Sequence, residues 1–330
     1  MAVRSKTVAS NIPAKPKIVA VVGPTASGKT SLGIALAKKF DGEIISADSR
    51  QIYRGMDIGT AKPPIAFKLK DAAHPNEPGY VEGIPHHLID IKNPDEEYTV
   101  ADFKRDATNA INDILAQGKL PILVGGTGLY VKAVLENLDI PTIKADPELR
   151  RKIEKEIETS GLDAVFKKLA ELDPEAAYIV DPKNPRRVVR ALEVATITGK
   201  PFTAQRRKSE PLYDVLEIGI NPLAEVLRKR TDQRIDGMIR DGLVDEVKIL
   251  MKKYDGKKLP VAFDAIGYRE IIDAIAGRCS IDAAIAAMKL NTWHFAKRQV
   301  TWFKKDKSIV WLQNEDATIT VVKRFLKTFL

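Results

Sequence analysis

Apolar residues gather in short runs along the first part of the chain. Residues 17–23, KIVAVVG, form a run that is rich in valine and stopped by glycine. A second run covers 42–49, GEIISADS, and a third covers 120–128, LPILVGGTG. Runs of this length that are apolar throughout are typical of strands buried in a parallel sheet. The pattern therefore predicts three buried parallel strands.

Helical patterns lie between and after these runs. Apolar residues recur at helical spacing over 29–40, and 103–118 is amphipathic and closed by glycine. Strand, helix, strand, helix and strand in this order predict an α/β fold with a doubly wound parallel sheet. After a long insertion, 214–222 returns to the sheet, and 308–315 predicts a last strand.

After about residue 140 the sequence pattern changes, and it predicts consecutive helices with no strand between them. An Asp or Asn before proline marks each helix start, since the first residue caps the helix and proline fits its first position. These pairs are Asp146-Pro147, Asp173-Pro174 and Asn184-Pro185. We therefore expect a catalytic core from 17–140 and 206–330, a helical insertion at 141–205, and a flexible arm at 1–16.

The first predicted strand leads directly into GPTASGKT at residues 23–30. Its glycines let backbone N–H groups approach phosphate oxygens, Lys29 adds positive charge, and the hydroxyl of Thr30 can reach Mg²⁺. The motif also stands between a strand and a helix, as phosphate binding requires. The expected phosphate-binding loop consists of Gly23, Pro24, Thr25, Ala26, Ser27, Gly28, Lys29 and Thr30.

A nucleotide hydrolase would also show an apolar strand that ends in an Asp or Glu, which holds magnesium. The run LPILV ends instead in Gly125-Gly126-Thr127. Asp48 is the comparable carboxylate, because it follows a strand whose end opens onto the same crevice as the loop. Asp48 is either a helix cap or a base or polar clamp acting on the substrate.

Composition adds limits rather than a function. Lys and Arg number 53 against 44 Asp and Glu, and the net charge of +9 fits either an anionic partner or a basic solvated surface. The single cysteine excludes a disulfide framework. The adjacent His86 and His87 have no third histidine nearby for a metal site, so they are expected to be structural or to line the crevice. Without a signal peptide or an 18-residue apolar stretch, the chain is expected in the cytoplasm.

Basic residues stand together on predicted helices. Arg230 and Arg234 are four residues apart on 226–239, so Arg230 is expected to be a second phosphate clamp unless that face is only solvated. Residues 293–307, WHFAKRQVTWFKKDK, mix cations with aromatics that either stack on bases or pack in the core, and Trp302 is expected in the core. One basic stripe for RNA phosphates is predicted from Arg186, Arg187 and Arg190.

An ordered set of motifs carries a family resemblance over about residues 17 to 312: GPTASGKT, ISADSRQIYRGMDIGTAKP, HHLID, LVGGTGLY, NPRRVVRALEV, AIGYRE and KRQVTWFK. Together they closely resemble the bacterial-type tRNA dimethylallyltransferase family, also called tRNA isopentenyltransferases or IPP transferases. The resemblance implies the P-loop NTPase-like fold of nucleotide kinases with no phosphoryl transfer. It also implies transfer of a dimethylallyl group from dimethylallyl diphosphate to N6 of the adenine on the 3′ side of the anticodon.

The reaction implied by this resemblance suggests roles for particular residues. The adenine amine is a poor nucleophile, so Asp48 is expected to be its base, and Thr127 either places a hydroxyl against the adenine or is a buried turn residue. Lys29 and Mg²⁺, held through Thr30, are expected to stabilise the leaving diphosphate. The expected tRNA contacts are Asp48, Ser49, Arg50, Gln51, Thr127, Arg150, Arg186, Arg187, Arg190, Gly267, Tyr268, Arg269, Lys297, Arg298 and Gln299. We expect a monomer that acts on tRNA away from membranes.

Three other functions remain compatible with these residues. A phosphotransferase for a small metabolite would share the loop and Asp48, but it leaves the arginine stripe unexplained. An RNA-binding regulator with an inactive site would not need Lys29, Thr30 and Asp48. A transferase that prenylates free adenine nucleotides would not need the helical insertion.

Overall fold

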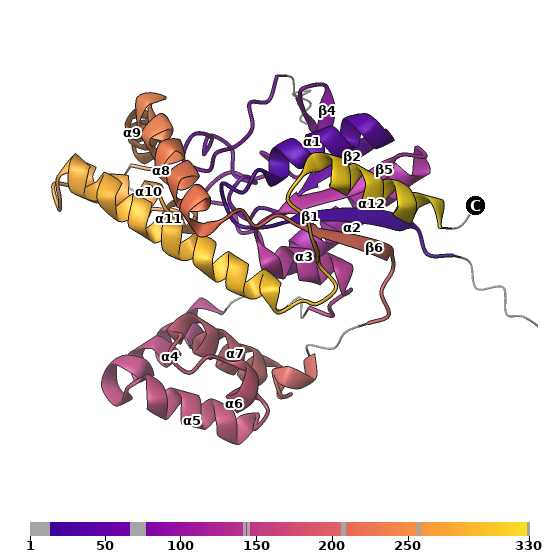
Figure 1. The fold of residues 1–330 in the computed structure, drawn as a ribbon. Helices are drawn as coiled ribbons and strands as arrows, with labels where there is room; N and C mark the ends of the chain where they lie inside the picture. Colours follow the sequence, from indigo (N-terminus) through magenta and orange to yellow (C-terminus); the bar gives the residue numbers. More distant parts are fainter. Residues whose placement is uncertain are drawn as a thin grey trace, which may run out of the picture. The chain divides into compact units, whose positions relative to one another are not determined.

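A parallel-dominated sheet forms the centre of the larger part of the molecule. The computed structural model describes residues 14–66, 77–140, 143, 146–205, 209–255 and 259–328. Within this part of the chain the sheet has seven strands in the order β3-β4-β2-β5-β1-β6-β7 (Figure 1). All neighbours pair in parallel except β3 and β4. The strands are β1 (Lys17–Val22), β2 (Gly42–Ser46), β3 (Gly79–Val81), β4 (Ile84–His87), β5 (Leu120–Gly125), β6 (Asp214–Gly219) and β7 (Val310–Trp311).

The predicted doubly wound α/β fold is confirmed, and its errors lie at the sheet edges. The antiparallel hairpin β3–β4 was not predicted, because its two short strands contain no apolar run. At the other edge β7 covers two residues instead of the predicted 308–315. The last residue of that segment begins α12 (Glu315–Lys327), whose start is capped by Asn314 through a 2.7 Å bond from the N–H of Ala317.

One face of the sheet is covered by α1 (Lys29–Phe40) and α12. Alternate residues of β1, Val19 and Val21, enter a buried cluster with apolar residues of both helices, as the two-residue period of a strand requires. Helix α12 is also tied to the start of β1, because Nζ of Lys17 donates to the carbonyl of Phe325 at 2.6 Å. The functional loops begin at the opposite ends of the strands, after the last residues of β1, β2 and β5.

The chain divides into two compact units. The larger contains residues up to 96, 109–128 and the chain from 212 onward, and the smaller contains 97–108 and 129–211. Helix α2 (Val100–Ala116) contributes residues to both units. After β6 the larger unit continues through α8 (Ala224–Arg240), α9 (Leu243–Lys253), the 3-10 helix η2 (Val261–Asp264), α10 (Tyr268–Ile275) and α11 (Ile281–Lys304).

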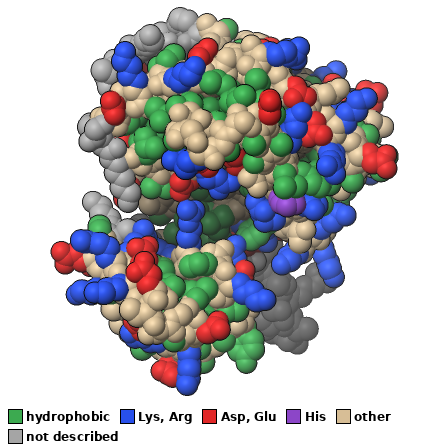
Figure 2. Space-filling model, turned by 90° about the vertical axis from the view of Figure 1, so that its left-hand side faces the viewer, with side chains coloured by type: hydrophobic (Ala, Val, Ile, Leu, Met, Phe, Trp, Pro, Cys, Tyr) green, Lys and Arg blue, Asp and Glu red, His purple; other side chains and the backbone are tan. Residues whose placement is uncertain are grey.

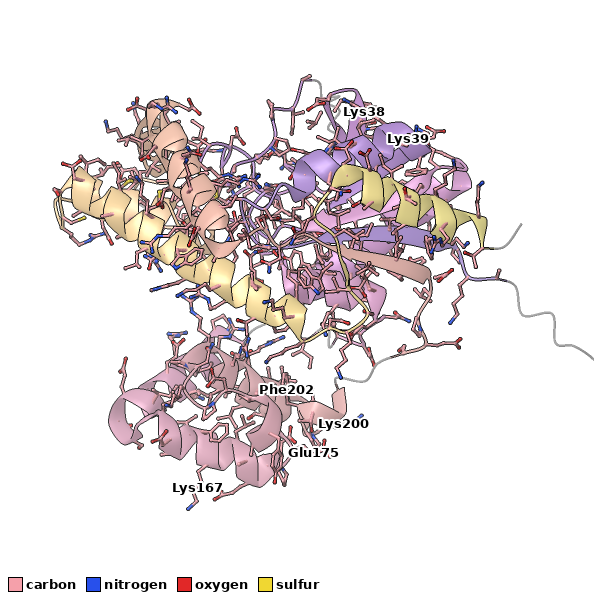
Figure 3. All side chains as sticks on the ribbon, viewed as in Figure 1. Lys38, Lys39, Lys167, Glu175, Lys200 and Phe202 are labelled. Atoms are coloured by element: carbon pink, nitrogen blue, oxygen red, sulfur yellow. The ribbon has the colours of Figure 1, made fainter. Side chains whose placement is uncertain are left out.

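The smaller unit is helical and has its own core. Val165, Val188 and Leu192 lie in a buried cluster, Phe202 packs against it, and Lys167 points away from the helices (Figure 3). The unit holds every described residue of the predicted insertion together with flanking residues on both sides. Its helices are α3 (Gly128–Leu135), α4 (Pro147–Ser160), α5 (Leu162–Leu172), α6 (Ala176–Ile179), α7 (Pro185–Thr198) and the 3-10 helix η1 (Thr203–Gln205).

Two of the three predicted helix caps in this unit are confirmed. The side chain of Asp146 accepts from the N–H groups of the first turn of α4, and that of Asn184 does the same for α7. The prediction for Asp173 is wrong, because that residue ends α5 and its carboxylate accepts from the N–H and hydroxyl of Thr203 at 2.9 and 2.7 Å. The first thirteen residues of the predicted arm lie outside the described residues.

Candidate active site

A tight turn joins β1 to α1 at the predicted phosphate-binding loop. Gly28 caps α1 with φ of 96°, a region that favours glycine. Because α1 begins directly at Lys29, its free N–H groups and the positive end of its dipole stand at the loop. Nζ of Lys29 donates to the carbonyl of Pro24 at 2.9 Å, so the side chain folds back over the loop. This local geometry suits a phosphate group.

The amine of Lys29 is withdrawn from bulk water. Burial lowers the pKa of Lys29 to about 8, although the negative charge of Asp48 acts in the opposite direction and the positive charge of Arg234 adds to the decrease. An anion placed beside the amine would reverse this shift. An anionic ligand would therefore further stabilise the charged form of Lys29.

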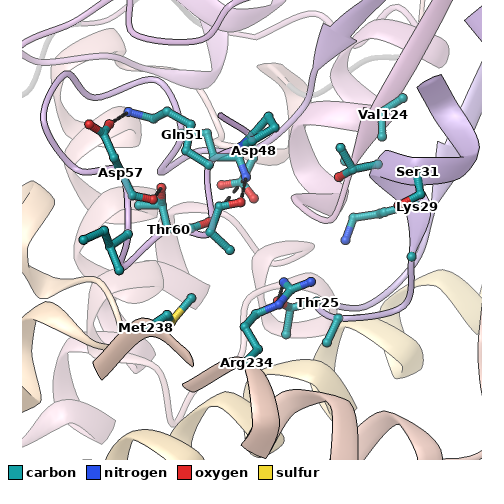
Figure 4. A pocket seen from close by; sticks show the side chains of 18 of the residues that line it. Thr25, Lys29, Ser31, Asp48, Gln51, Asp57, Thr60, Val124, Arg234 and Met238 are labelled. Atoms are coloured by element: carbon teal, nitrogen blue, oxygen red, sulfur yellow. Dashed lines mark hydrogen bonds and ion pairs between the residues drawn. The ribbon is translucent and has the colours of Figure 1, made fainter. Parts of the chain in front are cut away.

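An open cavity of about 700 Å³ lies beside the loop. Figure 4 shows Lys29 and Ser31 on one side of it and Gln51, Asp57 and Thr60 on the other. The second side is formed by the loop 57–64, most of whose residues line the cavity. No role was predicted for this loop from its residues.

Asp48 follows the end of β2 and lies between these two sides in Figure 4. Its Oδ1 accepts from the N–H of Arg50 at 2.9 Å, a turn that fixes the carboxylate. No helix begins there in the described chain, so the alternative that Asp48 is a helix cap is wrong. Its other oxygen receives no hydrogen bond from a described residue and is therefore available to a ligand.

The cation that reaches the main cavity from α8 is Arg234. Its Nη1 lies 3.5 Å from the hydroxyl of Thr25, and the charge of Asp48 acts on it. Burial lowers the pKa of Arg234, and Asp48 opposes that effect. Arg230, the residue predicted as the clamp, lines a neighbouring hollow beside Ala26 and Arg234 instead. The four-residue spacing had identified both arginines but could not rank them.

Thr127 follows β5 and is hydrogen-bonded within the protein. Its hydroxyl accepts from the N–H of Ser49 at 3.1 Å, and its own N–H donates to the carbonyl of Ala47. Thr127 thus joins the ends of β2 and β5 and holds the turn that carries Asp48. Among the predicted tRNA contacts, Gln51 also lines the cavity, where Nε2 donates to the carbonyl oxygens of Thr60 and Ala61 at 3.3 Å each.

Gln299 is buried rather than exposed, in contrast to the predicted surface contact. Its Oε1 accepts from the N–H of Thr25 at 2.8 Å, and its Nε2 donates to the carbonyl of Gly126 at 2.8 Å. The adjacent Lys297 and Arg298 are exposed. The amide therefore fastens α11 to the phosphate-binding loop, a role that a linear motif does not reveal.

Tyr268 is likewise a core residue, so its predicted position on an RNA-facing surface is wrong. The side chain is fully buried, and its hydroxyl donates to Glu246 at 2.6 Å. Gly267 starts α10 and donates its N–H to Glu270, while the exposed Arg269 pairs with the same carboxylate at 2.7 Å. The motif AIGYRE is thus used mainly for packing and for the start of a helix.

Comparison with known proteins identifies the family of the chain. A family model described as IPP transferase matches residues 51–306, and a second, described as Isopentenyl transferase, matches residues 16–72. The chain belongs to the IPP transferase family. The family identified from the ordered motifs is thereby confirmed, and so is its P-loop NTPase-like fold.

Curated and solved members of the family are similar over most of the chain. A tRNA dimethylallyltransferase of Halalkalibacterium halodurans is 46% identical over 261 residues, which cover 78% of each protein. The crystal structure of the full-length tRNA isopentenylpyrophosphate transferase from Bacillus halodurans is 41% identical, with a TM-score of 0.65 over 94% of this chain and 96% of that one. A eukaryotic dimethylallyltransferase acting on tRNA is 28% identical, with a TM-score of 0.74 over 94% of this chain and 79% of that one.

The arginines of the predicted stripe differ in their partners. Arg190 is partly exposed and pairs with the buried Glu193 at 2.6 Å, and Arg150, outside the stripe, pairs with the same carboxylate at 2.9 Å. Burial alone would raise the pKa of Glu193, but hydrogen bonds from the two arginines and from the N–H of Asp146 together hold the pKa below its ordinary value. Arg186 and Arg187 are exposed at the start of α7, and Arg187 forms no ion pair with a described residue.

Cations lie near two of the aromatic residues of α11, Trp293 and Phe295. Trp293 has Lys297 5.6 Å and Arg228 5.9 Å from its ring centre, and Trp302 is half-buried against Gly128. Figure 2 shows Lys and Arg side chains intermingled with Asp and Glu over the face in view. The net positive charge is therefore spread over this face instead of forming one continuous patch.

Neither the histidine pair nor the acidic residues form a metal centre of their own. His87 bonds to the buried Glu43 at 2.7 Å, and His86 is buried beside it in β4, so both are structural, one of the two roles predicted for them. Among the described residues, no group of three or more His, Cys, Asp or Glu side chains could hold a metal ion. Within the same residues, no helix combines the length and apolar character needed to cross a membrane.

Proposed function

We propose that the protein transfers a dimethylallyl group from dimethylallyl diphosphate to N6 of the adenine on the 3′ side of the tRNA anticodon, releasing diphosphate. The observation that carries this proposal is the placement of the carboxylate of Asp48 and the cations of Lys29 and Arg234 around the same cavity. Prenyl transfer needs this combination, because an amine must lose a proton while a diphosphate gains negative charge.

The leaving group belongs on the phosphate-binding loop. As the bond between the allylic carbon and the diphosphate oxygen breaks, positive charge spreads over the allyl group and negative charge grows on the diphosphate. Lys29, Arg234 and the N–H groups at the start of α1 are placed to stabilise that negative charge. Arg230, in the adjoining hollow, contributes more distantly.

The acceptor belongs beside Asp48. The N6 lone pair attacks the allylic carbon as diphosphate departs, and the new N–C bond leaves a surplus proton on nitrogen. The free oxygen of Asp48 accepts that proton, while the N–H of Arg50 keeps the carboxylate in place. Thr127 acts on the same residue indirectly, because it holds the turn at Ser49.

Magnesium fits this site as a companion of the substrate. Mg²⁺ commonly binds substrate phosphates with few protein ligands, which agrees with a cavity that offers the hydroxyl of Thr30 and the carboxylate of Asp48. When bound, it supplies further positive charge to the departing diphosphate. The protein residues retain the tasks of orienting both substrates and moving the proton.

The helical segment 141–205 is proposed as the tRNA-binding insertion of a monomer that acts in the cytoplasm on tRNA. A small acceptor nucleotide needs no such additional unit, whereas an anticodon stem-loop offers phosphates to exposed cations such as Arg186 and Arg187. Lys297 and Arg298 on α11 are proposed as further tRNA contacts of the larger unit.

The test is incubation of the purified protein with unmodified tRNA, dimethylallyl diphosphate and magnesium, followed by mass spectrometry of the nucleosides. We expect an adenosine carrying one dimethylallyl group. Parallel reactions contain a free adenine nucleotide as acceptor, or a nucleoside triphosphate without RNA. Prenylation of the free nucleotide alone, or triphosphate consumption in the absence of RNA, would contradict the proposal and favour one of the two alternative enzymes.

A further inference from the structure

The loop 57–64, DIGTAKPP, forms the wall of the cavity that faces the phosphate-binding loop in Figure 4. It has no regular secondary structure, and Ala61 within it has a positive φ of 51°. Two backbone hydrogen bonds lie within it: the N–H of Ala61 donates to the carbonyl of Ile58 and the N–H of Lys62 to the carbonyl of Asp57, both at 3.0 Å. These bonds shape the turn, but its position beside the cavity also depends on contacts with other elements.

One set of these contacts comes from Glu246 on α9. One carboxylate oxygen accepts from the N–H groups of Asp57 and Ile58 at 3.0 and 2.8 Å, and the other accepts from the N–H of Gly59 at 3.2 Å. The second oxygen also accepts from the hydroxyl of Tyr268 at 2.6 Å. Three consecutive backbone donors and one side-chain donor therefore meet on a single carboxylate.

The surroundings leave little freedom to this arrangement. A Cβ atom on Gly59 would lie 2.4 Å from the ring of Tyr268, so only glycine lets the loop approach that closely. Tyr268 itself is fully buried. Burial and the charge of Glu246 raise the pKa of Tyr268, which keeps its hydroxyl protonated as a donor. The tyrosine in turn fixes the carboxylate.

Two other side chains, Lys62 and Gln51, also hold this loop. Nζ of Lys62 donates to the carbonyl of Tyr53 at 2.8 Å and to Asp57 at 2.5 Å, and it also pairs with Asp90. Gln51 holds the middle of the loop through two carbonyl groups, as described above. Glu246 differs from both, because it connects the loop to the helices α9 and α10.

We propose that Glu246 is a positioning residue for prenyl transfer, which fixes the loop 57–64 as the cavity wall opposite the phosphate-binding loop and is itself held by Tyr268. The inference rests on the proposed function for its catalytic consequence, but not for its structural part. A wall that moves away would leave the acceptor and the allylic carbon poorly aligned, and a misplacement of about 1 Å can cost roughly 100-fold in rate.

The structural part is tested by hydrogen–deuterium exchange of the backbone amides 57–59. Replacing Glu246 with Ala should increase their exchange by about 10- to 100-fold, because a charge-assisted hydrogen bond is lost from each amide. Glu246→Gln keeps one acceptor oxygen and should give a smaller increase, and Tyr268→Phe a smaller increase still. Asp245→Asn changes an exposed neighbour on the same helix and serves as the matched control.

The catalytic part is tested by single-turnover transfer to tRNA beside equilibrium binding of dimethylallyl diphosphate. For Glu246→Gln we expect transfer about tenfold slower and for Glu246→Ala about 100-fold slower. Diphosphate affinity should stay within about twofold in Glu246→Gln, because the phosphate-binding loop is not touched. Unchanged amide exchange or unchanged transfer in both Glu246 variants overturns the inference. Absence of transfer by the unaltered protein would instead contradict the proposed function and leave the amide-exchange result to be judged alone.

Discussion

The N–H of Thr25 donates a 2.8 Å hydrogen bond to the side-chain oxygen of Gln299, which lies 274 residues later in the chain. The side-chain nitrogen of Gln299, Nε2, donates to the carbonyl of Gly126 at 2.8 Å. One side chain on α11 thus determines the distance between the phosphate-binding loop and the turn after β5. The loop is therefore shaped by the last long helix as well as by its own glycines.

Replacing Gln299 with Leu should weaken binding of dimethylallyl diphosphate. Two hydrogen bonds would be lost at a buried position, which together cost about 1–3 kcal/mol, or roughly 5- to 150-fold in affinity. Isothermal titration calorimetry measures the change directly. Thr301→Ala is the control, because its exposed hydroxyl bonds only within α11. Normal diphosphate affinity in Gln299→Leu would show that the loop keeps its shape without this contact.

Lys29 should make diphosphate binding dependent on pH. Burial lowers the pKa of Lys29 to about 8 in the free protein, whereas the bound diphosphate favours the charged form. Below that pH the lysine is already protonated, so affinity is insensitive to its titration. Above it the lysine must take up a proton on binding, so affinity falls as the pH rises. Dissociation constants measured from pH 7 to 9.5 would show the decrease.

Lys29→Ala is the matched variant for that measurement. Its affinity should be lower and should lose the alkaline decrease, and its turnover should fall by roughly 100- to 1000-fold, as for loss of one transition-state contact. Binding to tRNA should change little. If the alkaline decrease persists in Lys29→Ala, the titrating group lies elsewhere, and turnover near normal would remove the lysine from the diphosphate site.

Local patterns predicted the parts of the fold that local interactions determine. The strand at 17–23, the helix at 29–40 and the caps at Asp146 and Asn184 all depend on residues close in sequence. The hairpin β3–β4 was missed because its strands contain glycine, proline and histidine and are stabilised by pairing with distant β2. Short edge strands of this kind leave little signal in the sequence.

In the candidate site, too, the sequence predicted the features that depend on nearby residues and missed those that depend on distant ones. The phosphate-binding loop and Asp48 follow directly from strand ends, whereas a linear motif cannot tell which side chain of a helix points inward. For that reason Gln299 and Tyr268 were expected on an RNA surface and lie in the interior. The role of Glu246 could not be predicted, because its three backbone partners precede it by 187 to 189 residues.

Arg187 and Arg190 should behave differently despite lying on one helix. Arg187→Ala removes an exposed cation and should lower the slope of log affinity for tRNA against log salt by about 0.7 to 0.9. Arg190 instead shares the buried Glu193 with Arg150. Arg190→Ala should therefore destabilise the smaller unit by about 1–3 kcal/mol through loss of a charge-assisted hydrogen bond to a buried carboxylate.

The two measurements are fluorescence titrations with tRNA at several salt concentrations and thermal unfolding of both variants. An unchanged salt slope for Arg187→Ala would mean that this face of α7 does not contact RNA phosphates. A stable Arg190→Ala protein with a reduced slope would show that Arg190 leaves Glu193 to bind RNA. Either result would change the proposed role of the helical insertion.

Asp48→Asn distinguishes a base from a metal ligand. Asparagine keeps the shape and the oxygen that accepts from the N–H of Arg50, but it cannot usefully accept a proton. Single-turnover transfer to tRNA should therefore fall by about 100- to 10,000-fold, the usual contribution of a positioned base.

Binding of dimethylallyl diphosphate with magnesium should stay close to normal in the same variant, because that substrate is proposed to rest on Lys29, Thr30 and Arg234. An enzyme that used Asp48 to organise magnesium would lose metal-dependent diphosphate binding together with the chemistry. Equilibrium binding and single-turnover transfer, measured on one preparation, separate the two cases. Lost transfer with intact binding supports proton acceptance by the free oxygen of Asp48. Parallel loss of both would assign Asp48 to the metal, and another residue lining the cavity would then have to take the proton from N6.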